Sequence, residues 1–140
     1  LSISHFVLKE NYEKAVEHFQ QIHSILAAYE DMFGEYPWYR DGFKLIESPY
    51  AGMEHQTAIA YGNGYNNDVD SVTDYIIHHE IAHEWWGNSV TARDLSDVWL
   101  QEGFATYAEA LYLERKDGED ISILEKAWIH MSKELGFFML

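Results

Sequence analysis

Residues 78–83 read His78-His79-Glu80-Ile81-Ala82-His83, and a second motif, Trp99-Leu100-Gln101-Glu102-Gly103-Phe104-Ala105, follows after a spacer. Histidines four positions apart lie on the same face of a helix, so the imidazoles of His79 and His83 can reach one ion. Glu80 lies about 100° around the helix from His79, close enough to act on a water at that ion without being a ligand. The first motif therefore predicts a helix that carries a metal site with Glu80 as general base.

A third protein ligand has to come from outside this helix. A catalytic zinc has three protein ligands and keeps its fourth position open for water or substrate, and Glu102 is the candidate for the third. The alternative is an ordinary pair of helix histidines. It is weak because His79, Glu80 and His83 lie in an apolar segment, where buried polar groups need partners that a cation would supply. His78 is not part of the pair, because an alanine stands four residues after it.

Composition limits the classes of function. The chain has 140 residues, 47% of them hydrophobic and 16% aromatic, which indicates one packed domain. It has no cysteine, so neither a disulfide scaffold nor a thiolate metal site is available. The formal net charge of −15 disfavours nucleic acid and favours cationic partners such as the ammonium end of a peptide. No apolar run is long enough to form a transmembrane segment.

The hydrophobic pattern predicts an α+β fold in which a small mixed sheet packs on a helical layer. Residues 11–33 predict one long amphipathic helix that ends at Gly34, and residues 42–47 and 57–61 predict strands. Residues 1–9 are either a strand or an extended lead. The apolar face of the long helix comprises Tyr12, Val16, Phe19, Ile22, Leu26, Tyr29 and Phe33, while His18 and His23 are expected to be surface or packing residues.

Three more helices are predicted. The metal-site helix begins near Ser71 and stops at Gly87, and a second runs from Ser96 or Asp97 to Asp117 with Glu102 in its first turns. A third spans residues 121–135. Each of Thr106, Asn88 and Asp97 could be a hydrogen-bond partner that orients a metal ligand.

A segment punctuated by proline and glycine, residues 48–56, contains Glu54. An edge strand here could lie over the active site, along an extended peptide. On residue chemistry alone, the alternative of a solvent-exposed loop carboxylate is favoured for Glu54.

The two motifs, separated by eighteen residues from His83 to Glu102 and preceded by Ala51-Gly52-Met53-Glu54-His55, together resemble the M1 family of zinc aminopeptidases, which are gluzincins. The resemblance implies a thermolysin-like (zincin) catalytic subdomain with one Zn²⁺ per chain, bound by His79, His83 and Glu102. It also implies that Glu80 is the general base. Glu54, next to Gly52 and Met53, would bind the free α-amino group of the substrate.

The chain departs from the family pattern in two ways. His55 stands where the family has asparagine, and the family's catalytic tyrosine would lie beyond residue 140. Residues 1–140 are therefore expected to be a single partial domain, without the family's N-terminal β domain, catalytic-tyrosine segment and C-terminal helical domain. Those remaining domains of the parent protein would be partners of this segment. Whether the isolated segment is active stays open, as does its compartment, which could be cytoplasmic, periplasmic or secreted.

The expected function is zinc-dependent hydrolysis of the N-terminal residue from peptides that have a free N-terminus. One alternative is a thermolysin-like metalloendopeptidase, which needs no amine anchor. Another is a non-catalytic interaction module that retains the peptidase fold. The third is a zinc-stabilised structural domain, in which His55 or His78 would have to fill the fourth coordination position.

Overall fold

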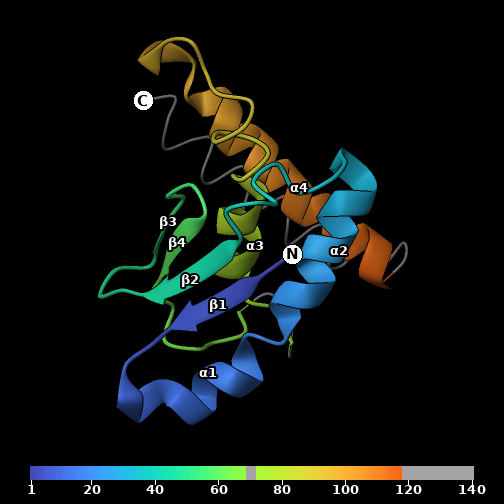
Figure 1. Ribbon diagram of the computed structural model, residues 1–140. Coiled ribbons are helices and arrows are strands. Elements are labelled where there is room, and N and C mark those ends of the chain that lie inside the picture. The colour runs from blue at the N-terminus through green and yellow to red at the C-terminus, as the bar shows by residue number, and fades with distance from the viewer. Residues whose placement is uncertain (69–71, 118–140) are drawn as a thin grey trace.

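The computed structural model describes residues 1–68 and 72–117, which form a small sheet beside a group of helices (Figure 1). The strands are β1 (Ile3–Phe6), β2 (Phe43–Glu47), β3 (Gly52–Met53) and β4 (Ala58–Tyr61), in the order β1-β2-β4-β3. β1, β2 and β4 are parallel, whereas β3 pairs antiparallel with β4 at the edge. The sheet is mixed, as predicted, and the first residues of the chain form a strand.

The helices before the sheet differ from the prediction. The chain forms α1 (Tyr12–His18) and α2 (Gln21–Phe33), with a short 3₁₀ turn at Lys9–Asn11, so the single long helix predicted for residues 11–33 is wrong. The break removes Tyr12 and Val16 from the apolar face, and both are exposed, whereas Phe19, Ile22, Leu26 and Tyr29 remain buried. α2 ends at Gly34, as predicted, in a left-handed conformation with φ of 96°.

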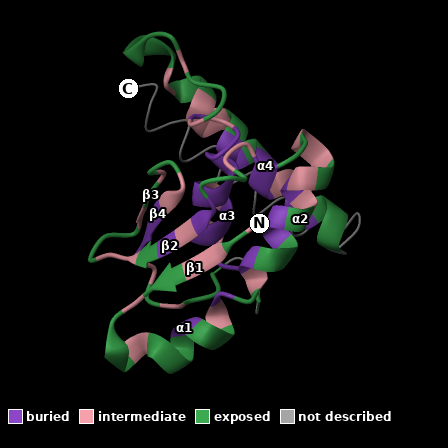
Figure 2. Cartoon of the chain, viewed as in Figure 1, coloured by how far each residue is buried: buried purple, intermediate pink, exposed green. Residues whose placement is uncertain are grey.

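Helix α3 (Tyr75–Ala82) carries the first motif and lies at the centre of the molecule, where it contacts α2, β3, β4 and α4 (Trp99–Asp117). Most of its residues are buried (Figure 2). It is shorter than the predicted helix, because it starts at Tyr75 and ends well before Gly87. Residue 71, the predicted start, lies outside the described residues. His83 follows the last helical residue but keeps α-helical φ and ψ of −62° and −19°, so it stays on the same face as His79.

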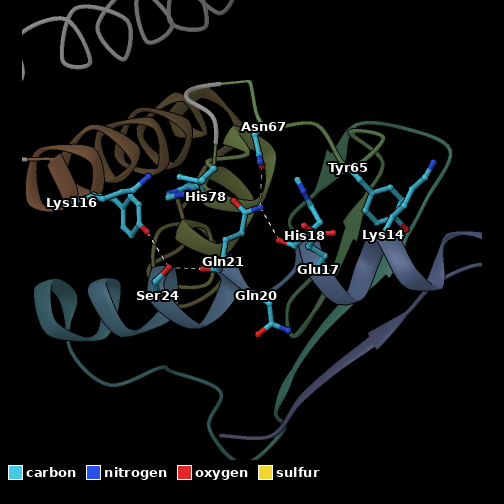
Figure 3. A pocket seen from close by; sticks show the side chains of 12 residues that line it. Lys14, Glu17, His18, Gln20, Gln21, Ser24, Tyr65, Asn67, His78 and Lys116 are labelled. Carbon is cyan, nitrogen blue, oxygen red and sulfur yellow. Dashed lines mark hydrogen bonds between the residues drawn. The ribbon is translucent and has the colours of Figure 1, made fainter.

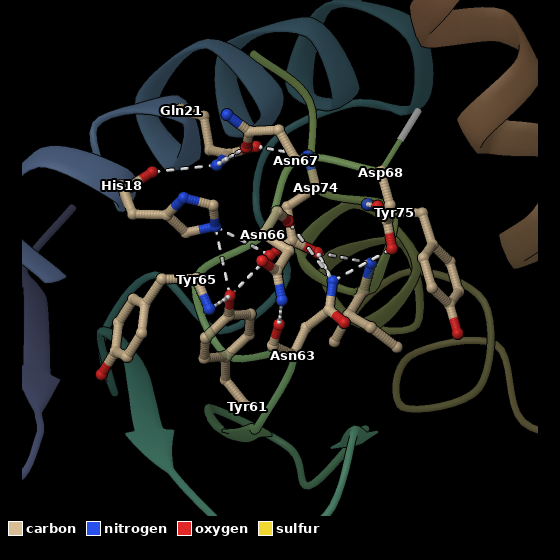
Figure 4. Close-up of polar contacts among 11 residues, drawn as sticks. His18, Gln21, Tyr61, Asn63, Tyr65, Asn66, Asn67, Asp68, Asp74 and Tyr75 are labelled. Atoms are coloured by element: carbon tan, nitrogen blue, oxygen red, sulfur yellow. Dashed lines mark hydrogen bonds and ion pairs between the residues drawn. The ribbon is translucent and has the colours of Figure 1, made fainter. Parts of the chain in front are cut away.

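The start of α3 is held by polar contacts of Asp74 (Figure 4). This residue is fully buried. Its Oδ1 accepts hydrogen bonds from the backbone N–H of Ile76 and from Asn63 Nδ2 at 3.0 and 2.9 Å. Its Oδ2 accepts one from the Tyr61 hydroxyl at 2.6 Å and lies 2.8 Å from His18 Nε2. His18 is thus a hydrogen-bonded network residue, which the sequence did not predict, and the network joins α1, β4 and α3.

Helix α4 packs against α3 through small buried residues that include Ala105 and Ala108. The predicted start near Ser96 or Asp97 is a short 3₁₀ turn, Leu95–Asp97, and the α-helix itself begins at Trp99. The helix predicted for residues 121–135 lies outside the described residues. None of the helices in residues 1–68 and 72–117 has the length and apolar character needed to cross a membrane.

Candidate metal centre

Three predicted ligands meet between α3 and α4. His79 Nε2 lies 3.0 Å from His83 Nε2, and Glu102 Oε2 lies 3.2 Å from the first and 3.4 Å from the second. Ligand atoms around a tetrahedral zinc with bonds of about 2.0–2.1 Å are roughly 3.3 Å apart. The spacing of these three donor atoms is therefore what a zinc-sized cation requires.

Hydrogen bonds on the far side of each imidazole determine which nitrogen faces the centre. His83 Nδ1 lies 2.9 Å from the carbonyl oxygen of Trp86, and His79 Nδ1 lies 2.7 Å from Glu109 Oε1. Because both partners are acceptors, both Nδ1 atoms carry the proton, and in neutral imidazoles both Nε2 lone pairs then point at each other. Two lone pairs 3.0 Å apart beside a carboxylate repel unless a cation or a proton lies between them. The residues fit a metal ion.

The carboxylates around His79 give the centre its electrostatic character. Burial lowers the pKa of His79, but hydrogen bonds to Glu102 and Glu109 outweigh burial and raise that pKa well above its ordinary value. Burial likewise raises the pKa of Glu102, and here the hydrogen bonds from His79 and His83 prevail and hold it well below the usual range. The site therefore stabilises a positive charge beside Glu102.

Glu109 was missed in the sequence, although it stands seven residues after Glu102 and so lies two turns along the same helix face. The three residues predicted as partners of the ligand side chains make other contacts or are exposed. Thr106 Oγ1 donates to the backbone carbonyl of Glu102 at 2.8 Å, and Asn88 Nδ2 donates to the carbonyl of Glu54 at 2.9 Å. Asp97 is exposed.

Glu80 is buried at the bottom of the same site, with 5% of its surface exposed. A Cβ atom at position 52 would collide with its carboxylate, so any larger residue there would require the Glu80 side chain to shift. Among the described residues, Glu80 Oε2 has no hydrogen-bond partner. Burial raises the pKa of Glu80 to about 7, with His79 and His83 opposing the shift and Glu54 and Glu102 adding to it. Such a carboxylate is suited to accept a proton near neutral pH.

The structure brings Glu54 to this centre from the edge of the sheet. Carboxylate oxygens of Glu54 and Glu80 and a ring nitrogen of His83 all lie within 4.8 Å of one another. Glu54 is half-buried, so the alternative of an exposed loop carboxylate does not describe it. Met53, beside it, is 42% exposed.

The two spare histidines do not join the described donor groups. His55 is exposed. His78 packs against Tyr112 with ring centroids 4.2 Å apart and lines a pocket of about 640 Å³ to which α1, α2 and α4 also contribute (Figure 3). Among the described residues, then, neither spare histidine belongs to the donor groups that could hold a metal ion, whereas the alternative of a structural zinc site requires one of them as a ligand.

A His-Glu-x-x-His helix that meets a glutamate from the next helix defines a class, the zinc peptidases with two histidines and one glutamate as ligands. The model of the Peptidase family M1 domain matches residues 17–135, and the chain belongs to this family. The family predicted from the motifs is confirmed, and with it the assignment to the peptidases.

The aminopeptidase relatives are much longer than this chain. Aminopeptidase B of Rattus norvegicus is 36% identical over 103 residues, which cover 72% of this chain and 15% of that protein. Aminopeptidase Ey of Gallus gallus is 36% identical over 86 residues, 56% of this chain and 9% of that protein. The chain thus spans about 15% of the length of the aminopeptidase B sequences it matches.

Solved structures confirm the fold class. The M1 zinc metallopeptidase of Deinococcus radiodurans, as a mutant bound to a Tyr-Ser-Ala substrate, superposes with a TM-score of 0.61 at 31% identity. The superposition covers 78% of this chain and 24% of that one. Another structure of the metallopeptidase from this organism gives a TM-score of 0.59 at 32% identity, over 76% of this chain and 23% of the other.

Proposed function

We propose that the protein is a zinc aminopeptidase, in which His79, His83 and Glu102 bind Zn²⁺ and the N-terminal residue of a peptide is removed by hydrolysis. The observation that carries this proposal is the pair of Nε2 atoms 3.0 Å apart, with both Nδ1 protons directed to acceptors outside the centre. The names of the relatives, which are aminopeptidases and zinc metallopeptidases, support it.

Zinc at such a site supplies Lewis acidity, which makes a water more acidic and polarises a carbonyl. The chain's own part of the reaction falls to Glu80. Its buried carboxylate accepts the proton from the attacking water and returns that proton to the leaving amine when the peptide bond breaks. The raised pKa of Glu80 suits both directions of transfer.

Glu54 gives the reaction its preference for the end of a peptide. A carboxylate binds an ammonium group through a charge-assisted hydrogen bond. Because Glu54 lies beside Glu80 and His83, an α-ammonium bound to it would place the first peptide bond next to the proposed base. The net charge of −15 also favours the approach of a cationic end.

The test compares the hydrolysis of a short peptide with that of its N-acetylated twin, with and without a metal chelator. It uses the full-length polypeptide, which includes the further domains proposed below. We expect cleavage of the free-amine peptide only, abolished by the chelator. A Glu80→Gln variant should keep its zinc and lose at least about a hundredfold in kcat. Equal cleavage of both peptides would indicate an endopeptidase. No cleavage by protein that contains zinc would indicate a non-catalytic module, and either result would overturn the proposal.

The proposal extends to the organisation of the protein. Residues 1–140 would be one part of a catalytic domain, and further domains would complete the substrate site together with it. The greater length of the aminopeptidase relatives supports this organisation.

A further inference from the structure

The loop that presents Glu54 is short, and among the described residues its internal backbone hydrogen bonds do not include the carbonyl of Glu54 or the N–H of Thr57. β3 contains two residues, and its pairing with β4 ends at Met53. Beyond it the chain turns sharply, with Ala58 N–H bonded to the His55 carbonyl at 2.9 Å. Thr57 has a φ of 61°, in the left-handed region that β-branched residues disfavour. Strain of this kind persists only where surrounding contacts hold the residue, so contacts from outside the loop have to offset it.

Two side chains from the segment that follows α3 hold this loop in place. Glu84 is completely buried, and its Oε1 accepts a hydrogen bond from the backbone N–H of the strained Thr57 at 2.7 Å. Asn88 Nδ2 donates to the backbone carbonyl of Glu54 at 2.9 Å. These two contacts hold the Glu54 carbonyl and the Thr57 N–H, while the Thr57 carbonyl accepts from the backbone N–H of Lys44 at 3.0 Å.

The same segment is tied to a proposed metal ligand. The backbone N–H of Asn88 donates to the carbonyl of His83 at 2.9 Å, and the Trp86 carbonyl lies 2.9 Å from Nδ1 of the His83 ring. Val90 N–H closes the turn on the Trp85 carbonyl at 2.9 Å. The turn that orients one imidazole is thus also the turn that holds the carbonyl of Glu54.

We propose that Glu84 and Asn88 are positioning residues that set the separation between the Glu54 carboxylate and the metal centre, and so make binding depend on the substrate's free amine. This inference rests on the proposed function of Glu54 as the amine anchor. Neither residue belongs to the three-ligand group His79, His83 and Glu102, so their loss should affect recognition of the amine and leave metal binding intact.

The experiment measures binding without turnover, in the Glu80→Gln form of the intact polypeptide loaded with zinc. The probes are leucyl-glycyl-glycine and its des-amino analogue isocaproyl-glycyl-glycine, titrated by calorimetry. The variants are Asn88→Asp, which replaces the donor by an oxygen at nearly constant size, and Glu84→Ala. Glu84→Gln retains an oxygen that can accept from Thr57, and Glu114→Ala removes an exposed carboxylate from α4 as a matched control.

We expect Asn88→Asp and Glu84→Ala each to weaken the binding of leucyl-glycyl-glycine by roughly five- to tenfold, which corresponds to the loss of one hydrogen bond. The des-amino analogue and the zinc content should be unchanged, and Glu84→Gln and Glu114→Ala should bind both probes like the parent. Equal weakening of both probes, loss of zinc, or no change in either variant would overturn the inference and leave the proposed function standing. If the Glu80→Gln protein without a further substitution bound both probes equally, the proposed function would fail and the inference with it.

Discussion

The metal-ligand cluster and the Glu54 loop lie side by side but are built differently. The cluster combines α3 and the much longer α4, and each of its imidazoles is bonded on its far side, to Glu109 or to the Trp86 carbonyl. The loop follows a two-residue strand, contains a threonine with φ of 61°, and is held by side chains from another segment. The part that would perform the chemistry is thus held by two helices and the turn that follows α3. The part that would select the substrate depends on its neighbours.

The largest effect is expected from breaking the cluster itself. His83→Ala removes one of the three predicted ligands, and zinc affinity should fall by more than about a hundredfold, the upper range for loss of a residue that only supports a ligand. Competition with a chromogenic chelator measures this change. His55→Ala, at an exposed histidine near the site, is the control. Zinc affinity unchanged in His83→Ala would show that the metal is held elsewhere.

Weakening the start of α3 should have the next largest effect. Asp74→Ala deprives the Tyr61 hydroxyl, Asn63 and the Ile76 N–H of their acceptor and should destabilise this region by about 3 kcal/mol. Faster hydrogen exchange of the α3 amides would report it. Asp94→Ala removes a comparable cap from an exposed turn and should leave exchange in α3 unaffected. Equal effects of the two variants would contradict the role assigned to the buried network.

A smaller effect is expected behind His79. Glu109→Ala removes the acceptor for His79 Nδ1, which frees the ring to rotate and lets its proton move to Nε2. Zinc affinity should fall by roughly 10- to 100-fold, the usual range for a partner of a metal-bound histidine. Glu114→Ala, an exposed carboxylate on the same helix, should bind zinc like the parent. Identical affinities in both variants would show that Glu109 does not orient the imidazole.

The smallest effect tests the loop. Thr57→Gly relieves the left-handed strain and should stabilise the turn by up to about 1 kcal/mol, since glycine's greater freedom in the unfolded chain offsets part of the gain. Ala58→Gly, in the adjoining strand, should instead destabilise it by about 0.5–1 kcal/mol. Local hydrogen exchange at residues 57–61 separates the two. Destabilisation by both would mean that Thr57 is not strained.

Much of the fold could be predicted, because the spacing of apolar residues and the positions of glycine depend only on the local sequence. The strands at residues 43–47 and 58–61 and the end of α2 at Gly34 follow from alternating apolar residues and from glycine. The break between α1 and α2 was missed, because the apolar spacing runs through it without interruption. His18 packs against aromatic rings, as one of its two predicted roles required, but its hydrogen bonds were not predicted because Asp74 and Tyr61 are more than forty residues away in the chain.

The sequence by itself determined the pairing of His79 with His83, because a separation of four residues places two side chains on one helix face whatever surrounds the helix. It also determined the family, through two motifs in a fixed order. Only the tertiary structure decided that Glu109 supports His79, that Glu54 reaches Glu80, and that Glu84 and Asn88 hold the loop. These contacts join segments that are distant in the chain, and only the packing of helices against the sheet brings such segments within hydrogen-bonding range.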